Sequence, residues 1–318
     1  MDTSLEPGEQ EAKREVPADF KAGFVALCGK PNVGKSTLLN KLLGQKVAAV
    51  SFRPQTTRRR QLGILTLEKA QVIFVDTPGM HKPAHRLGEY MNDEAGAAMA
   101  DADLVVFMVN ASQPPDAEDI LLADALKQVN PMPPIILAMN KIDLVPESDL
   151  AERQPAFQAL VPSAVVIQLS AVSGRQTSLL LEEIISRLPT GQPFFDPDQV
   201  TDYYERQIAG ELVREAALNF LREEVPHSIA VRVEDYVERG ESGAYIVATI
   251  FVERDSQKGI VIGQGGSMLK KIGASARKEI EAMSGRKVFL ELRVKVEKNW
   301  RNRQEALQLL GYHRMEED

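Results

Sequence analysis

The residues with the clearest chemical meaning form a short run near the start of the chain. They are Gly29, Lys30, Pro31, Asn32, Val33, Gly34, Lys35, Ser36 and Thr37. The first eight match the pattern G-x-x-x-x-G-K-[ST], which is typical of a loop whose backbone N–H groups surround phosphate groups. In such a loop the lysine, here Lys35, reaches the β- and γ-phosphates, and the hydroxyl group of Ser36 ligates Mg²⁺. The pattern therefore predicts a polyphosphate site that uses magnesium.

A second polar run follows the apolar residues 71–75. It consists of Asp76, Thr77, Pro78 and Gly79 and matches D-x-x-G. In a protein with a phosphate-binding loop, an aspartate at this position holds Mg²⁺, often through a water molecule, and the glycine N–H group detects the γ-phosphate. We therefore predict that this run lies beside the phosphate-binding loop.

A third run, which follows the apolar residues 135–139, selects the base. Here Asn140, Lys141, Ile142 and Asp143 match N-K-x-D. The carboxylate of Asp143 can accept hydrogen bonds from N1–H and the 2-amino group of guanine, whereas adenine offers no such pair of donors and would leave the carboxylate unpaired. Asn140 would connect the base to the phosphate-binding loop, and the stem of Lys141 can lie along the base.

A fourth run, Ser170 and Ala171, follows residues 165–169 and offers a backbone N–H group to the guanine O6. These four runs are predicted to come together because each directly follows an apolar segment that reads as a buried strand. In a sheet of parallel strands, ligands bind at the carboxyl ends of the strands. The spacing thus predicts one guanine nucleotide site at one edge of a sheet.

Apolar segments and helical patterns alternate from residue 21 to about residue 189. Strands are predicted at residues 24–28, 61–67, 71–75, 104–109, 135–139 and 165–169, and helices at 35–43, 88–100, 116–128, 148–159 and 177–187. Such alternation is typical of an α/β fold with a mostly parallel sheet and helices on both faces.

With these markers in this order, residues 21–190 resemble a translation-factor-type GTPase domain. The resemblance implies that residues 51–60 form a switch segment in which one threonine ligates Mg²⁺ and contacts the γ-phosphate. Thr57 is favoured because it directly precedes Arg58, as in the T-R pattern of related GTPases, and Thr56 is the alternative.

One departure from Ras-like GTPases concerns the attacking water. Ras-like enzymes place a glutamine directly after D-x-x-G, but Met80 stands here and cannot orient water, so we expect slow intrinsic hydrolysis. Asn32 resembles the position that binds K⁺ in potassium-stimulated GTPases, where the ion can stabilise developing charge. That Asn32 only shapes the loop is the alternative, and both interpretations stay open.

A second domain is predicted after a linker rich in turn-forming residues at 191–202. A helix at about 203–223 precedes strands at 228–233 and 244–252, and the run Gly263, Gln264, Gly265 and Gly266 then matches G-x-x-G. A helix at 267–283, a strand at 287–296 and a last helix from residue 300 follow. In a KH domain, an α+β fold, a G-x-x-G loop holds the backbone of single-stranded nucleic acid.

The charge of this part of the chain supports a nucleic-acid partner. Residues 254–303 hold 13 lysines and arginines against five acidic residues, although the whole chain has a net charge of −7. A local basic strip of this kind is typical of an RNA- or DNA-contacting face. The candidate RNA-binding side chains are Lys258, Lys270, Lys271, Arg277 and Trp300. For Trp300, stacking on a base and packing under the terminal helix are equally favoured.

A GTPase domain followed by a C-terminal KH domain of the type II kind resembles the Era family of bacterial ribosome-assembly GTPases. The runs that carry this resemblance are 55–58, 198–202 and 298–301. It implies GTP and GDP as ligands, Mg²⁺ as cofactor, and binding to small-subunit (16S) ribosomal RNA near its 3′ end during 30S subunit maturation. It also implies a cytoplasmic location with some peripheral association at the inner face of the cell membrane. We expect a monomer.

Composition agrees with these expectations. Cys28 is the only cysteine, so no disulfide bond forms within the chain, and it lies in an apolar run that does not favour a nucleophile. No apolar run approaches the length of a membrane span. We predict a mobile acidic tail at 1–20, a GTPase domain at 21–190, a linker at 191–202 and a KH domain at 203–318.

The main alternative is an RNA-binding module with a phosphate-binding domain that holds a nucleotide without hydrolysing it. The intact set Thr57, Asp76 and Gly79 speaks against it. A kinase or ATPase is a further alternative, which Asn140 and Asp143 disfavour because they suit guanine.

Overall fold

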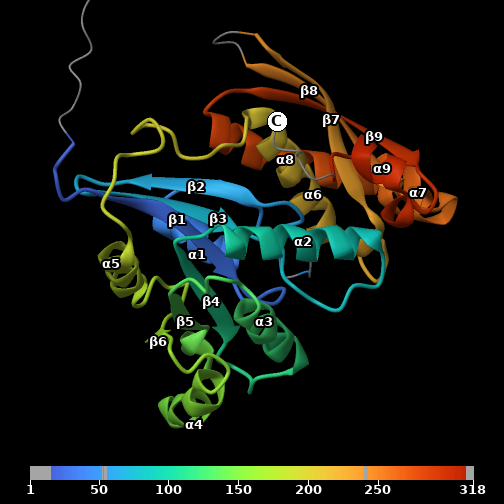
Figure 1. Cartoon of the computed structure of the whole chain (residues 1–318). Helices are drawn as coiled ribbons and strands as arrows, with labels where there is room; N and C mark the ends of the chain where they lie inside the picture. Colours follow the sequence, from blue (N-terminus) through green and yellow to red (C-terminus); the bar gives the residue numbers. More distant parts are fainter. Residues whose placement is uncertain (1–15, 52, 54–55, 240–242, 313–318) are drawn as a thin grey trace, which may run out of the picture.

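The computed structural model describes residues 16–51, 53, 56–239 and 243–312, and Figure 1 shows their arrangement. The acidic tail predicted for the start of the chain lies outside the described residues as far as residue 15, as do Phe52, Pro54 and Gln55 of the predicted switch segment. The described residues form two sheets, each with its own helices, and α2 (Arg86–Ala100) runs between them in Figure 1.

The first sheet confirms the predicted α/β class. In the described chain it has six strands in the order β2-β3-β1-β4-β5-β6. Only β2 pairs in the antiparallel sense, with β3, and the other pairs are parallel. The strands are β1 (Lys21–Cys28), β2 (Gln61–Thr66), β3 (Ala70–Asp76), β4 (Leu104–Asn110), β5 (Ile135–Asn140) and β6 (Val165–Gln168).

Helices cover both faces of this sheet because side chains along a strand point alternately to opposite sides. Ala26 of β1 packs in the core that faces α2, α3 (Ala117–Lys127) and α4 (Glu147–Gln158). Its neighbours Val25 and Leu27 pack in the core that faces α1 (Lys35–Leu43) and α5 (Thr177–Arg187). The fully apolar strands of the sequence are thus buried on both sides, as expected for a parallel sheet.

The second sheet is smaller and has the order β7-β8-β9 in the described residues. Its strands are β7 (Ala230–Glu238), β8 (Ala244–Val252) and β9 (Val288–Val296). Strand β8 pairs antiparallel with β7 and parallel with β9. One core joins this sheet to α6 (Glu205–Phe220), α7 (Asp255–Ile262) and α8 (Ser267–Ser284). The last helix is α9 (Gln304–Leu309).

Helix α7 is the element that the sequence analysis did not predict. The apolar run at 259–262 forms its last turn rather than an independent segment. The helix begins after Arg254 because the side chain of Gln257 accepts hydrogen bonds from the backbone N–H groups of Glu253 and Arg254, at 2.9 and 3.1 Å. It ends at Gly263, whose φ of 70° only glycine adopts without strain. The G-x-x-G run therefore connects two helices.

A separate apolar cluster joins the two parts of the molecule. Leu87 and Met91 of α2 pack there against Trp300 and Tyr312 from the C-terminal part of the chain. The cluster explains why α2 lies between the sheets. Among the described residues, none of the helices combines the length and the apolar composition needed to cross a membrane.

Candidate nucleotide site and RNA-binding groove

The phosphate-binding loop has the shape that its glycines allow. Gly34 has a φ of 108°, and a Cβ atom there would lie 2.4 Å from Nδ2 of Asn140. Any larger residue would therefore clash with the side chain that crosses this loop. In its present position the Lys35 amine donates to the carbonyl oxygens of Gly29 and Lys30, at 2.9 and 3.2 Å. Burial lowers the pKa of Lys35, an effect that the nearby carboxylate of Asp76 opposes.

Three oxygen atoms predicted to serve the magnesium site lie together. Ser36 Oγ is 2.7 Å from Asp76 Oδ2 and 2.9 Å from Thr57 Oγ1, and Thr57 Oγ1 is 3.0 Å from the same Asp76 oxygen. The hydroxyl of Thr56 is directed elsewhere and donates to the Arg53 carbonyl at 2.9 Å. Of the two candidate threonines, the structure places Thr57 in the cluster.

The geometry of this cluster fits a magnesium ion. Mg²⁺ has octahedral ligands at 2.0–2.1 Å, which sets neighbouring ligand oxygens about 2.9 Å apart. The Ser36 and Thr57 hydroxyl oxygens have that separation. The second oxygen of Asp76, Oδ1, is buried without a hydrogen-bond partner and suits a metal-bound water. Burial raises the pKa of Asp76, while Lys35, Ser36 and Thr57 favour its ionised form.

The D-x-x-G run lies against the phosphate-binding loop. A Cβ atom on Gly79 would be 2.6 Å from the backbone nitrogen of Pro31, so only glycine permits this approach. Thr77 is buried and its hydroxyl donates to the Leu27 carbonyl at 2.8 Å, which fixes the turn at Pro78 to the end of β1. The side chain of Met80 packs in the core below and cannot position water.

Asn140 connects three of the predicted runs. Its Nδ2 donates to the Val33 carbonyl at 2.7 Å, and its Oδ1 accepts from the backbone N–H group of Ala171 at 2.9 Å. The residue is 2% exposed, so these bonds are shielded from water. Lys141, whose pKa burial lowers, follows with a left-handed backbone, and the exposed Asp143 stands next to it. Ser170 is buried in the adjacent loop.

These residues divide into two connected regions. A cleft lies over the phosphate-binding loop, and its lining includes Asn32, Ser36, Thr37, Thr57 and Gly79. The base-selecting residues lie outside that cleft but are tied to it through Asn140. The arrangement can hold a triphosphate and metal in the cleft and a base beyond it.

Sequence reasoning missed an ion pair at the loop. Lys30 is 7% exposed and donates to Asp116 Oδ2 at 2.5 Å and to Asp119 Oδ2 at 2.9 Å. Burial alone would lower the pKa of Lys30, but these two carboxylates raise it. The pair ties the phosphate-binding loop to the start of α3. Its residues are far apart in the chain, so no local pattern indicates it.

A groove of about 430 Å³ lies beside the G-x-x-G run. Gly266, Lys270 and Arg277 line it, and so does Phe289, which is 67% exposed. Sequence analysis did not single out Phe289, although a large aromatic residue out of phase with the apolar side of β9 was a usable signal. The other predicted residues Lys258, Gln264 and Lys271 are not part of its lining. Gly263 and Gly265 have positive φ values of 70° and 58°.

The structure contradicts the proposed stacking of Trp300 on an RNA base. Its side chain has no exposed surface, and its indole N–H donates to the Ser228 carbonyl at 2.8 Å. The ring stacks on Tyr312, with 5.9 Å between ring centroids. Of the two roles considered from the sequence, packing under the C-terminal helix is therefore the one that the structure supports.

Comparisons with known proteins agree with the two sites. Residues 24–141 match the family described as "50S ribosome-binding GTPase", and residues 224–301 match the family "KH domain". The chain is 46% identical over 295 residues to GTPase Era of Leuconostoc citreum (strain KM20), with 92% of this chain and 97% of that protein covered.

Two solved structures are similar over nearly the whole chain. Both have a TM-score of 0.87 and 39% identity, and each alignment covers 92% of this chain and 99% of the other. One is Era in complex with MgGDPNP and nucleotides 1506–1542 of 16S ribosomal RNA. The other is a single-residue variant of Aquifex aeolicus Era bound to GDP·AlF4⁻.

Proposed function

The chain belongs to the Era family of GTPases, and from that premise we propose that it is a GTP-driven switch that binds small-subunit ribosomal RNA. It binds this RNA near the 3′ end and assists 30S subunit assembly and maturation. One observation carries the proposal: the hydroxyl groups of Ser36 and Thr57 and the carboxylate of Asp76 meet at a nucleotide cleft, on a chain that also has a basic groove at a G-x-x-G run. The solved relative bound to 16S RNA and MgGDPNP supports the pairing of these ligands.

The residues of the cleft divide the chemistry of GTP hydrolysis among them. Backbone N–H groups of the phosphate-binding loop, to which Pro31 adds none, would hold the β- and γ-phosphates. The Lys35 amine would turn from the loop carbonyls to the phosphates. Ser36 and Thr57 would hold Mg²⁺ directly and Asp76 through water. Mg²⁺ neutralises charge on the phosphate oxygens when it is bound. Because Met80 is buried in the core, positioning of the attacking water falls to the backbone or to other groups, and the intrinsic rate is slow.

Selection of guanine rests on residues at the ends of β5 and β6. Asp143 accepts hydrogen bonds from the N1–H and 2-amino groups. The backbone N–H group of Ala171, the O6 donor expected from the sequence, donates to Asn140 Oδ1 in this structure and would have to be shared with O6. Asn140 keeps these groups in register with the phosphate-binding loop through its bonds to Val33 and Ala171. An adenine nucleotide would leave the Asp143 carboxylate unpaired, which a polar site rejects strongly.

A potassium ion is the finer part of the cofactor proposal. Asn32 has a left-handed backbone with a φ of 63° and is one of the residues that line the cleft. Asparagine tolerates this conformation well, so loop shape alone also accounts for the residue. The test is the hydrolysis rate in KCl and in NaCl. If K⁺ binds, the wild type is faster in KCl and Asn32→Ala removes the difference; equal rates in both salts leave Asn32 as a loop-shaping residue.

The RNA-binding part is the groove between α8 and β9. Lys270 and Arg277 neutralise backbone phosphates, Phe289 stacks on a base, and the glycines at 263–266 let phosphates approach the main chain. We assign the GTPase domain to residues 21–190, the linker to 191–202 and the KH domain to 203–318.

A single experiment tests the proposal and its main alternative. Phosphate release is measured under single-turnover conditions with GTP and with ATP, in Mg²⁺, with and without an oligonucleotide of the 16S 3′ end. We expect slow release from GTP, none from ATP, and binding of the oligonucleotide. Binding of GTP and RNA without any release would instead establish a hydrolytically silent module. Equal use of ATP would contradict the base-selection argument.

The family supports a cytoplasmic protein with peripheral association at the inner face of the cell membrane. No amphipathic segment in the sequence argues independently for the membrane contact. Sedimentation of the purified chain with anionic lipid vesicles tests it, because protein that stays in the supernatant at low salt has no affinity for such a surface. Light scattering of the same sample tests the expected monomer.

A further inference from the structure

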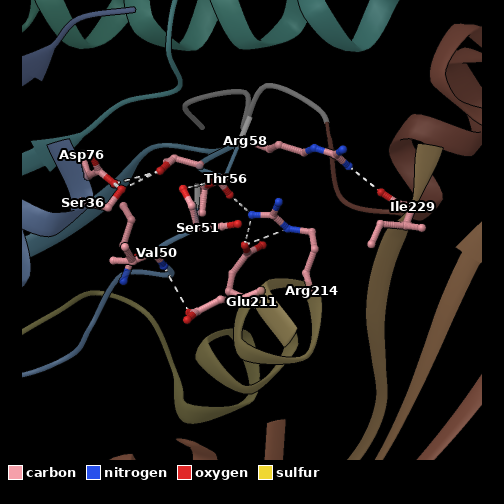
Figure 2. Close-up of polar contacts among 12 residues, drawn as sticks. Ser36, Val50, Ser51, Thr56, Arg58, Asp76, Glu211, Arg214 and Ile229 are labelled. Carbon is pink, nitrogen blue, oxygen red and sulfur yellow. Dashed lines mark hydrogen bonds and ion pairs between the residues drawn. The ribbon is translucent and has the colours of Figure 1, made fainter. Parts of the chain in front are cut away.

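The segment that joins α1 to β2 lies between the nucleotide cleft and the second domain. On its inner side, Thr57 contacts Ser36 and Asp76 of the magnesium cluster. On its outer side, the two neighbours of Thr57 bond to the second domain. The Thr56 carbonyl accepts from Arg214 Nη2, and Arg58 donates to the Ile229 carbonyl at 2.7 Å. Figure 2 shows these opposed contacts, with Ser36 and Asp76 on one side and Arg214 and Ile229 on the other.

Helix α6 supplies a continuous set of partners for this segment. Glu211, Glu215 and Asn219 are spaced four residues apart and so share one face of the helix. Glu215 Oε2 accepts from the Val50 N–H group at 3.1 Å, and Asn219 Oδ1 accepts from the Ser51 hydroxyl at 3.0 Å. Helix α6 of the second domain therefore contacts the described part of the segment at Val50 and Ser51 as well as at Thr56.

Arg214 bonds the carbonyl of the residue directly before Thr57. It is 1% exposed, and its guanidinium also pairs with Glu211 on the preceding turn of α6. A planar guanidinium that bonds a carboxylate and a carbonyl at once fixes their relative positions. Here the carboxylate belongs to α6 and the carbonyl belongs to Thr56, directly before Thr57. The orientation of the Thr57 backbone is thus set from the second domain.

Arg58 completes the support from the other side. Its side chain is 2% exposed, donates to the Ile229 and His227 carbonyl oxygens, and lies 5.7 Å from the centre of the Trp300 ring. With both neighbours fixed, the residue between them has little freedom. A misplacement of about 1 Å at a reacting group can reduce a rate about 100-fold.

From this arrangement we infer that Arg214 is a positioning residue for GTP hydrolysis, supplied by the second domain, that acts through Thr57. The inference rests on the proposed GTPase function and adds to it a residue outside the GTPase domain. Thr57 serves the γ-phosphate side of the site. Loss of Arg214 should therefore weaken the binding and hydrolysis of GTP but not the binding of GDP, which lacks the γ-phosphate. If Arg214 only joined the domains, its loss would affect the GTP-bound and GDP-bound states equally.

The test uses the full chain and the variants Arg214→Ala and Arg214→Lys. At saturating GTP and Mg²⁺, we expect Arg214→Ala to lower the single-turnover rate by about 10- to 100-fold. Its affinity for GDP should stay within about twofold of the wild type, whereas GDPNP should bind more weakly and require more Mg²⁺. Arg214→Lys keeps the positive charge beside Glu211 but lacks the planar set of N–H donors of the guanidinium group. This variant should recover part of the hydrolysis rate.

Arg206→Ala is the matched control. Arg206 lies on the same helix and bonds the Val233 and Glu234 carbonyls, at 2.7 and 2.5 Å, within the second domain. We expect its hydrolysis rate and its GDPNP affinity to match the wild type. Equal losses in Arg206→Ala and Arg214→Ala would show a general effect of the helix and overturn the inference.

A double-mutant cycle with Thr57→Ala keeps the inference falsifiable even if Arg214→Ala is less stable. If Arg214 acts through Thr57, removing Arg214 from a Thr57→Ala protein should not slow hydrolysis further. A second, independent loss of the same size would overturn the inference, as would an unchanged GDPNP affinity in Arg214→Ala. A wild type that fails to hydrolyse GTP would instead refute the proposed function, so the two failures are distinguishable.

Discussion

Base selection in the proposed function depends on the side chain of Asp143, which is exposed at the end of β5. Asp143→Asn replaces one acceptor oxygen with a donor, which suits the 2-oxo group of xanthine rather than the 2-amino group of guanine. We expect the ratio of GTP to XTP affinity to change by about 10⁴-fold in favour of XTP. Competition against a fluorescent nucleotide measures this ratio.

The matched control for this substitution is Asp149→Asn. Asp149 is partly exposed and pairs with Arg153 within α4. It should keep the wild-type preference for GTP. If Asp143→Asn also keeps that preference, the base is not read by this carboxylate.

Lys30 shows how a single buried charge can fix the shape of the loop. Lys30→Ala would leave the fully buried Asp119 without its partner, and breaking a buried pair costs about 3 kcal/mol. We expect that loss in the free energy of unfolding by urea. Lys127→Ala is the control because its pair with Asp124 is exposed on both sides and should cost less than about 0.5 kcal/mol. Similar losses in both variants would mean that the buried Lys30–Asp119 pair contributes no more to stability than an exposed ion pair.

At the scale of elements, α8 and β9 form the groove in which Phe289 is exposed. Phe289→Ala should weaken binding of a single-stranded 16S 3′-end oligonucleotide by about 1–3 kcal/mol, because one stacking surface is lost. GTP hydrolysis without RNA should not change, since the groove is separate from the cleft. Fluorescence anisotropy with a labelled oligonucleotide measures the affinity.

Tyr204→Ala is the control for the groove. Tyr204 is 79% exposed and belongs to the same domain, but it does not line the groove. Its removal should leave the RNA affinity unchanged. Equal weakening in the two variants would indicate that any exposed aromatic residue contributes, and that the groove is not the binding site.

Several elements could be predicted from sequence to the residue. The bounds of α1, α5 and β8 agree with the sequence prediction, because glycines or turn residues limit long apolar patterns there. Helix α7 could not be predicted because the short apolar run at its end follows Gly259, a poor helix former. Such a run is equally compatible with a strand. Its start depends on the Gln257 side chain, whose capping role is visible only in three dimensions.

The residues of the candidate site also divide into those that the sequence could predict and those that it could not. The four nucleotide-binding runs could be predicted because each is a local pattern at the end of a strand. The contacts of Arg214 with Thr56 and of Lys30 with Asp119 could not, because they join residues 158 and 89 positions apart. Trp300 carries no local signal that distinguishes a buried ring from an exposed one, and its packing depends on Tyr312 and on Ser228.

At the scale of the whole molecule, two features occur in the same arrangement of the domains. Thr57 lies in the magnesium cluster while Lys270, Arg277 and Phe289 remain exposed in the groove. Contacts of α6 and of Ile229 hold Val50, Thr56 and Arg58 in this arrangement, so we expect a nucleotide that needs Thr57 to favour it, and with it the exposed groove. GTP and RNA binding should therefore be positively coupled.

This coupling gives a prediction that does not depend on how the domains move. If GDPNP raises the affinity for the 16S oligonucleotide by some factor relative to GDP, the oligonucleotide must raise the preference for GDPNP over GDP by the same factor. Couplings of this kind are typically about 5- to 150-fold. Arg214→Ala should reduce both factors equally toward one, because it releases the Thr56 carbonyl from α6. Titration of each ligand in the presence of the other measures both factors.

A wild-type factor of one would show that the nucleotide and the groove act independently. A factor that Arg214→Ala leaves unchanged would show that the coupling runs through other contacts between the domains.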